Sequence, residues 1–332
     1  MYNEYYGKKI LIIGGSGTIG NHLVRRLLLE EPQVIRIFSR DEHKQYEMNI
    51  EFQKDANRLR YLIGDVRDLQ RLTRAMEGID YVFHLAAMKH VPSCEYNPFE
   101  AVQTNVIGTQ NVIQAALENN VTKVLFTSTD KAISPTNTYG ATKLTAERLI
   151  SAAEFQKGSK GTIFSSVRFG NVMGSRGSVI PLFKKQILEN RRITVTDSNM
   201  LRYMMTPSQA IELILQANNR AQGGEVFVLK MPVIRIGDLA EVMIDLVTKR
   251  YRIDSEVEIR NIGLRPGEKR YEELMTMDEY AVAEETENMF VIPALYSGNI
   301  RRNEDPDFDS LQFNPISKSL ISDWLETEGL VK

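Results

Sequence analysis

Short apolar segments alternate with amphipathic ones along the first half of the chain. Each apolar segment is bounded by polar or turn-forming residues, which is typical of buried strands. Six segments are predicted to be strands: Ile10–Ile13, Val34–Phe38, Leu59–Asp65, Asp80–Ala87, Lys123–Thr129 and Gly161–Val172. Helical periodicity lies between them, notably over Asp68–Met76 and Pro98–Asn119. This alternation predicts right-handed βαβ crossovers, and therefore an α/β fold with a doubly wound parallel sheet of Rossmann type.

The regular alternation weakens after Val172. The later chain contains a glycine-rich stretch, MGSRGSVIPLF, then a strand-like segment, EVFVLK, and a turn that leads into a predicted helix, RPGEKRYEEL. We therefore expect a Rossmann domain over residues 1–172 and roughly 200–235. A smaller C-terminal domain, expected to bind the substrate, takes roughly 173–199 and 236–332.

Composition narrows the class of protein. The chain has 332 residues, 42% of them apolar and 25% charged, with a net charge of −2, so no basic field indicates nucleic-acid binding. The one cysteine, Cys94, excludes a disulfide framework within the chain. The N-terminal residues lack the apolar run of a signal peptide, and no segment is apolar enough to span a membrane. We expect a cytoplasmic protein that binds neither nucleic acid nor membrane.

The four histidines are dispersed without the spacing of metal ligands, so no metal site is predicted. His84 lies inside an apolar strand, where a buried structural role is expected.

A glycine turn joins the first strand to the first helix. Gly14, Gly17 and Gly20 are spaced GxxGxxG, and Thr18 and Ile19 lie between the last two. Such a turn lets the backbone approach a pyrophosphate and presents the N–H groups of a helix N-terminus to it. The turn therefore predicts a dinucleotide site, and the alternative is a tight strand-to-helix connection without a ligand.

The ends of the second and third strands predict the cofactor. Ser39 and Arg40 stand where NAD-binding proteins usually place an acidic residue, and an arginine there can neutralise a 2′-phosphate. Asp41 is expected to cap the following helix. NADP is therefore favoured, and a solvated loop is the alternative. Asp65 and Val66 are expected to frame the adenine, although an aspartate there also suits a turn.

Tyr139 and Lys143 share one face of a predicted helix because they are four residues apart. An isolated tyrosine is a poor base, with a pKa of about 10. A nearby ammonium favours the phenolate and lowers that pKa. Thr129 closes the preceding strand and Asn105 lies in the helix before it, so the pair is more than two ordinary helix residues.

The order of the glycine turn, Asn105, Thr129, Tyr139 and Lys143 resembles the extended short-chain dehydrogenase/reductases. Within that superfamily the chain is similar to the UDP-N-acetylglucosamine 4,6-dehydratases. That similarity is carried by AAMKHVPSCEYNPFEAVQTNVIGTQNV, STDKAISPTNTYGATK, RFGNVMGSRGSVIPLF and LRPGEK. The adjacent Asp130 and Lys131 are specific, since simple sugar epimerases of the superfamily lack this pair and deoxythymidine-diphosphoglucose dehydratases carry Asp-Glu there. The resemblance implies an NADP-dependent dehydratase of UDP-N-acetylglucosamine that assembles as a homo-oligomer.

The resemblance also implies the catalytic roles. Tyr139 acts as the base for oxidation at C4, with Thr129 bonded to the same oxygen and Lys143 tuning the tyrosine. Lys131 then removes the C5 proton, and Asp130 protonates the departing C6 hydroxyl, so the lysine must be neutral and the carboxyl protonated. The hydride taken from C4 returns at C6. The alternative for Asp130 and Lys131 is a surface ion pair at a turn.

The remaining contacts are expected from the same resemblance. The cofactor-binding set is Gly14, Gly17, Thr18, Ile19, Gly20, Ser39, Arg40, Asp65, Val66, Ala86, Ala87, Asn105, Tyr139 and Lys143. The substrate-binding set is Lys89, His90, Asn171, Arg202, Arg265 and Glu268. Arginine suits the diphosphate because its planar fork matches phosphate oxygens.

The sequence is also compatible with other functions. Family members that retain the C5 configuration tend to carry methionine where this chain has Tyr139, which favours inversion at C5. A retaining dehydratase or a UDP-sugar 4-epimerase is the nearest alternative, and loss of water separates the epimerase. A non-catalytic NADP-binding sensor is a further alternative, but it has no use for Thr129, Tyr139 and Lys143 together.

Overall fold

The computed structural model describes residues 4–264, 267–294 and 314–332 of the chain. These residues form two compact units. The first unit takes residues 4–169, 211–229 and 274–294, and the second takes 170–210, 230–264, 267–273 and 314–332. Each unit has its own apolar core.

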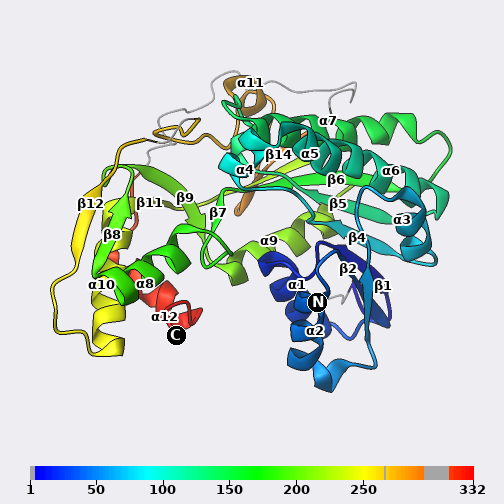
Figure 1. Cartoon of the computed structure of the whole chain (residues 1–332). Coiled ribbons are helices and arrows are strands. Elements are labelled where there is room, and N and C mark those ends of the chain that lie inside the picture. The colour runs from blue at the N-terminus through cyan, green and yellow to red at the C-terminus, as the bar shows by residue number, and fades with distance from the viewer. Residues whose placement is uncertain (1–3, 265–266, 295–313) are drawn as a thin grey trace. The chain divides into compact units, whose positions relative to one another are not determined.

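A large sheet forms the centre of the first unit (Figure 1). Within the described residues it has nine strands in the order β3-β2-β1-β4-β5-β6-β10-β14-β13. These are β1 (Lys9–Ile13), β2 (Val34–Ser39), β3 (Leu59–Ile63), β4 (Tyr81–His84), β5 (Lys123–Thr127), β6 (Ile163–Arg168), β10 (Val226–Leu229), β13 (Glu284–Glu285) and β14 (Met289–Ile292). The strands from β3 to β10 pair in parallel, and only β14 and β13 are antiparallel to their neighbours. The strand order reverses between β1 and β4, which confirms the predicted doubly wound sheet.

Helices cover both faces of this sheet (Figure 1). On one face, α3 (Leu69–Met76), α6 (Gly108–Glu118) and α7 (Thr138–Gln156) bury apolar residues against alternate positions of the strands. On the other face lie α1 (Thr18–Leu28) and α9 (Pro207–Arg220), which are joined by an ion pair between Arg26 and Glu212. The shorter helices of this unit are α2 (Glu42–Glu51), η1 (Gln53–Asp55), α4 (Val91–Tyr96), α5 (Pro98–Ala101), η2 (Val102–Ile107), η3 (Asp130–Ala132) and α11 (Met277–Tyr280).

Local signals explain several of these boundaries. The side chain of Asp41 accepts a hydrogen bond from the Lys44 amide at 3.1 Å, which confirms the predicted cap of α2. Asp68 caps α3 in the same way. The segment EVFVLK contributes β10, so the expected late strand is also confirmed.

Three expectations from the sequence are wrong in detail. The helix predicted over Pro98–Asn119 is interrupted by the π-helical η2, which contains Asn105. The sixth strand ends at Arg168, because Asn171–Val172 pairs instead with a strand of the second unit as β7. The described residues 267–274 contain no helix, since the carbonyls of Lys269 and Arg270 accept hydrogen bonds from Arg202 rather than from a helical ladder.

Within its described residues, the second unit combines two small sheets with three helices. The sheets contain β7 (Asn171–Val172), β9 (Leu201–Met205) and β11 (Val233–Arg235) in one, and β8 (Arg192–Val195) with β12 (Glu258–Asn261) in the other. The helices are α8 (Val179–Asn190), α10 (Ile236–Tyr251) and α12 (Lys318–Thr327). None of the helices in the described part of the chain has the length and apolar composition that crossing a bilayer requires.

Candidate active site

The glycine turn lies at the carboxyl ends of β1 and β4, where the strand order reverses. Gly14 has φ +82°, and a Cβ atom there would lie 2.8 Å from the Ala86 nitrogen, so only glycine fits this approach of two strand ends. Gly17 is the N-cap of α1 and, as a glycine, makes no side-chain cap hydrogen bond. The first turn of α1 begins with Thr18 and Ile19, and Gly20 packs directly against Gly15.

The end of β2 is fixed by a buried amide that sequence reasoning missed. Gln45, on α2, donates to the Ser39 hydroxyl at 2.9 Å, to the Ser39 carbonyl at 3.1 Å and to the Leu62 carbonyl at 3.0 Å. The Ser39 hydroxyl also accepts from Ser16 of the glycine turn at 2.8 Å. Ser39 is therefore held between the glycine turn and the end of β3, whereas the Arg40 side chain is 58% exposed.

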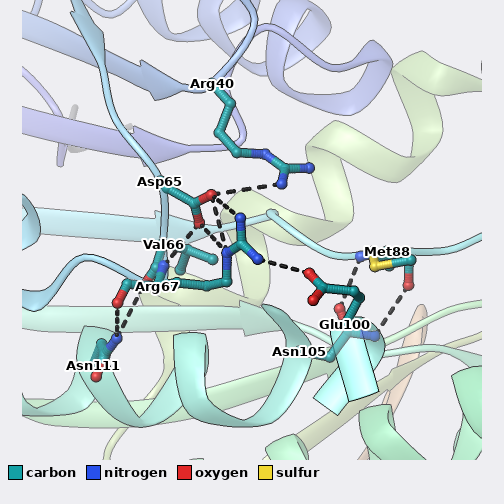
Figure 2. A network of polar contacts seen from close by, with 8 residues as sticks. All are labelled: Arg40, Asp65, Val66, Arg67, Met88, Glu100, Asn105 and Asn111. Atoms are coloured by element: carbon teal, nitrogen blue, oxygen red, sulfur yellow. Dashed lines mark hydrogen bonds and ion pairs between the residues drawn. The ribbon is translucent and has the colours of Figure 1, made fainter. Parts of the chain in front are cut away.

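Asp65, which follows β3, forms ion pairs with two arginines (Figure 2). Arg67 contacts both carboxylate oxygens, and Arg40 approaches Oδ2 at 3.5 Å. Burial alone would raise the pKa of the Asp65 carboxyl, but the hydrogen bonds from Arg67 and the charge of Arg40 hold it below its usual value. Val66 is buried, and its carbonyl accepts from Asn111.

Asn105 uses its whole side-chain amide to join two segments. Its Oδ1 accepts from the Met88 amide at 2.8 Å, while Nδ2 donates to the Met88 carbonyl at 3.0 Å and to the Thr142 hydroxyl at 2.9 Å. The side chain therefore orients the segment after β4 relative to α7, and Figure 2 shows its contacts with Met88. That segment includes the half-buried Ala86 and Ala87.

Thr129, Asp130 and Lys131 form a compact cluster after β5. Asp130 is fully buried, and its Oδ1 accepts from the Thr129 hydroxyl at 2.9 Å and from Lys131 Nζ at 2.9 Å. Its Oδ2 is buried and has no hydrogen-bond partner among the described residues. Because the Lys131 side chain is only 22% exposed, this is not a surface ion pair.

Tyr139 lies beside that cluster at the start of α7. Burial raises the pKa of its hydroxyl to about 12, while the positive charge of Lys131 and a hydrogen bond with Thr129 act in the opposite direction. Lys143 is buried, donates to the Thr127 carbonyl at 2.6 Å and lies 3.9 Å from the centre of the Phe126 ring. Burial lowers the pKa of Lys143 to about 7. Lys131 is therefore one nearby cation that lowers the pKa of Tyr139, and tuning by Lys143 stays a prediction.

Three residues expected to bind substrate line one cavity in the second unit. Asn171, Arg202 and Glu268 contribute to a cavity of about 200 Å³ that α8 and β9 also line. Arg202 is 8% exposed and lies 3.6 Å from a Glu268 carboxylate oxygen. Arg265 lies outside the described residues.

Lys89 and His90 belong to the first unit, after β4, and both are exposed. His90 precedes α4, and partial desolvation of its ring together with the charge of Lys89 lowers the pKa of the imidazole. His84, by contrast, is fully buried and pairs with the Thr109 hydroxyl at 3.0 Å, as expected for a core residue.

A buried ionic network behind α7 was also missed. Arg168 is fully buried and donates to Glu147 on α7, to Glu279 on α11 and to the Leu274 carbonyl. The sequence did contain one signal for this network, which is an arginine inside an apolar strand. A buried arginine requires polar partners, so such partners could have been expected. Neither glutamate could be assigned to it from spacing.

A comparison with protein families decides the classification. Residues 10–294 match the model of a family described as polysaccharide biosynthesis protein. The chain belongs to this family. The predicted resemblance to the extended short-chain dehydrogenase/reductases is thereby confirmed.

Three curated relatives of this family member are similar over most of its length. An uncharacterized membrane protein of Methanocaldococcus jannaschii is 50% identical over 87% of each chain. A UDP-N-acetylglucosamine 4,6-dehydratase (inverting) of Campylobacter jejuni is 43% identical over 87% of this chain and 83% of the relative. A UDP-glucose 4-epimerase of Rickettsia massiliae is 42% identical over 87% of this chain and 84% of the relative.

Solved structures agree with the fold. The structure of Pen from Bacillus thuringiensis is 55% identical, covers 100% of both chains and has a TM-score of 0.93. DesIV from Streptomyces venezuelae, a dTDP-glucose 4,6-dehydratase solved with NAD and TYD, is 20% identical. It covers 96% of this chain and 97% of its own, with a TM-score of 0.72, and supports the fold alone.

Proposed function

We propose that the protein is an NADP-dependent UDP-N-acetylglucosamine 4,6-dehydratase that inverts C5. The observation that carries this proposal is the pair of the buried Asp130 and the half-buried Lys131, joined at 2.9 Å beside Tyr139. The relative named as the inverting dehydratase supports the same reaction. The similarly related epimerase keeps a 4-epimerase as the second candidate, so the two must be separated by the chemistry of the product.

The first unit fits a dinucleotide. A Cβ atom at Gly14 would clash with the Ala86 backbone, so the carboxyl ends of β1 and β4 approach closely there, and the N-cap of α1 is Gly17, which has no side chain to cap the helix. These features suit a pyrophosphate, which accepts backbone N–H groups. Ser39 and Arg40 are proposed to bind the adenosine ribose and its 2′-phosphate. Bound NADP would supply the hydride chemistry, taking a hydride from C4 of the sugar and returning it at C6.

Tyr139 is proposed to accept the proton of the C4 hydroxyl, with Thr129 hydrogen-bonded beside it. The unliganded environment holds the phenol protonated, since burial dominates its pKa. Deprotonation therefore requires positive charge, which Lys131 provides in part and which a bound oxidised nicotinamide increases. Lys143 is proposed to hold the nicotinamide ribose.

Asp130 and Lys131 are proposed to carry out the elimination. Moving one proton along their hydrogen bond converts ammonium and carboxylate into an amine and a carboxylic acid without any change in total charge. The amine then accepts the C5 proton, the C5–C6 double bond forms, and the carboxylic acid donates its proton to the C6 hydroxyl, which leaves as water. The pair ends as ammonium and carboxylate, so protons balance through the step.

The second unit is proposed to bind the nucleotide part of the substrate. Its cavity is lined by Asn171, Arg202 and Glu268, together with apolar side chains of α8 and β9. Arg202 already donates to three carbonyls, those of Leu201, Lys269 and Arg270, so its position is fixed before a ligand binds. Arg265, Lys89 and His90 remain proposed contacts to the sugar nucleotide. We propose the two units as the cofactor domain and the substrate domain of a cytoplasmic homo-oligomer.

One experiment tests the reaction. The protein is incubated with UDP-N-acetylglucosamine in deuterated water, and the product is followed by mass spectrometry and NMR. Loss of one water with deuterium at an inverted C5 is expected. A 4-keto product with retained C5 would indicate the retaining dehydratase, and an isomer of unchanged mass would indicate the epimerase. Unchanged substrate with a bound nucleotide would favour the sensor.

A further inference from the structure

Arg67 is a charged residue near the cofactor end that the proposed function does not use. It follows Asp65 and Val66 in the loop after β3, and Figure 2 places its guanidinium between Asp65 and Glu100. Its NH1 donates to Glu100 on α5 at 2.7 Å, and its NH2 donates to Asp65 Oδ2 at 2.8 Å. Its Nε lies 3.1 Å from both oxygens of Asp65, and its own backbone amide donates to Oδ1 at 2.9 Å.

Arg40 also approaches the Asp65 carboxylate, but its contact is longer than those of Arg67. Its NH1 lies 3.5 Å from Asp65 Oδ2, and no hydrogen bond between these atoms meets ordinary geometry. Its side chain is 58% exposed, compared with 24% for Asp65. The Asp65 carboxylate is therefore bound mainly by Arg67, and the guanidinium of Arg40 can still bind another anion.

We propose that Arg67 is a positioning residue that determines the preference for NADP over NAD by keeping Asp65 away from Arg40. This inference rests on the proposed NADP binding at Ser39 and Arg40. Without Arg67, Asp65 would pair closely with Arg40, and the paired guanidinium would bind a 2′-phosphate less well. Glu100 holds Arg67 from the opposite side and so supports the same arrangement.

Direct binding of the phosphate by Arg67 is the competing explanation. The two explanations differ in their dependence on Asp65. If Arg67 acts through Asp65, removing Arg67 weakens binding of the 2′-phosphate only while residue 65 carries a charge. If Arg67 binds the phosphate itself, removing Arg67 weakens that binding by the same factor whether residue 65 is charged or neutral.

The test uses two fragments that differ only in the 2′-phosphate, 2′,5′-ADP and 5′-AMP. Their dissociation constants are measured by calorimetry on the full chain after bound nucleotide has been removed, and the ratio of the two constants is the readout. Contacts to adenine and to ribose cancel in this ratio, and so does a general loss of stability. The wild type is expected to favour 2′,5′-ADP at least tenfold, and Arg40→Ala should abolish most of this preference.

Arg67→Ala is expected to lower the ratio about three- to tenfold, the range of one partly exposed charged contact. Arg67→Lys should restore part of it. In an Asp65→Asn background, Arg67→Ala should change the ratio less than about twofold. Arg74→Ala, on the exposed face of α3, removes the same charge and should leave the ratio unchanged.

The outcomes separate the two proposals. A wild type that binds both fragments equally would refute the NADP preference and this inference with it. A wild type that discriminates, together with an unchanged ratio in Arg67→Ala, would refute only the role of Arg67. An equal loss with and without the Asp65 charge would assign Arg67 to the phosphate itself and overturn the positioning role.

Discussion

Replacing Arg168 by methionine should strongly destabilise the first unit. The buried guanidinium donates five hydrogen bonds: two to Glu147, two to Glu279 and one to the Leu274 carbonyl. Methionine fills similar volume but donates nothing. Glu279 keeps its hydrogen bond from the Thr276 amide in the capping box of α11, whereas Glu147 is left fully buried.

The magnitude follows from the cost of that uncompensated carboxylate. Removing one partner of a buried ion pair typically costs about 3–5 kcal/mol. Protonation limits the cost, because neutralising a carboxyl of pKa about 4.3 at pH 7 requires about 4 kcal/mol, and at pH 5 only about 1 kcal/mol. We therefore expect a loss of about 3–5 kcal/mol at pH 7 that shrinks to about 1–2 kcal/mol at pH 5.

The expected direction of the pH dependence agrees with the direction in which the pKa of Glu279 is shifted in the wild type. Burial acts to raise it, but the hydrogen bonds and charge of Arg168 lower it below its ordinary value. A depressed carboxyl pKa stabilises the fold above the unfolded pKa and loses that contribution as the pH falls. In Arg168→Met the carboxyl pKa values are raised instead, so stability falls as the pH rises. The gap between the two proteins must widen with pH.

Urea unfolding at both pH values measures this gap. Far-UV circular dichroism is the suitable signal, because the one tryptophan, Trp324, belongs to the second unit. Arg148→Met is the matched control: this arginine is 44% exposed and lies 3.7 Å from Glu279, so its loss should cost less than about 1 kcal/mol. A deficit below 1 kcal/mol for Arg168→Met, or one equal at both pH values, would refute the reasoning.

Three further outcomes are expected. Gly14→Ala should destabilise the first unit by at least about 1 kcal/mol more than Gly7→Ala in calorimetry, because both have positive φ but only Gly14 would clash, with Ala86. Wild-type stability should rise between pH 7 and about 10, since Lys143 with a folded pKa of about 7 binds fewer protons than the unfolded chain, and Lys143→Met should flatten this rise in urea titrations. Lys131→Met and Asp130→Asn should both lower C6 deoxygenation about 10²–10⁴-fold, but only Lys131→Met should suppress deuterium exchange at C5. Normal dehydration by Lys131→Met would exclude the proposed elimination step.

The features that the sequence predicted correctly are local. Strand and helix periodicity, the cap at Asp41 and the core position of His84 depend on residues close in the chain or on the pattern of one element. The catalytic candidates could be named because Thr129, Asp130, Lys131, Tyr139 and Lys143 fall within one short stretch after a predicted strand.

The features that it missed depend on distant partners. Arg168 and Glu279 are 111 positions apart, and no periodicity links them. The absence of helix in residues 267–274 likewise follows from hydrogen bonds that their carbonyls accept from Arg202, which is 67 positions before Lys269. The effect of Lys131 on the pKa of Tyr139 also escaped, since the spacing on α7 pointed only to Lys143.

That last difference has a structural cause in Gly140. A Cβ atom at Gly140 would lie 2.0 Å from the Lys131 carbonyl oxygen, so the first turn of α7 packs directly on the backbone of η3. The glycine between Tyr139 and Lys143 is thus required by packing rather than by chemistry. It lets the helix approach closely enough for the Tyr139 hydroxyl to meet Thr129 and the charge of Lys131. The groups proposed for oxidation and for elimination are therefore positioned by the same contact, and a side chain at residue 140 should impair both steps together.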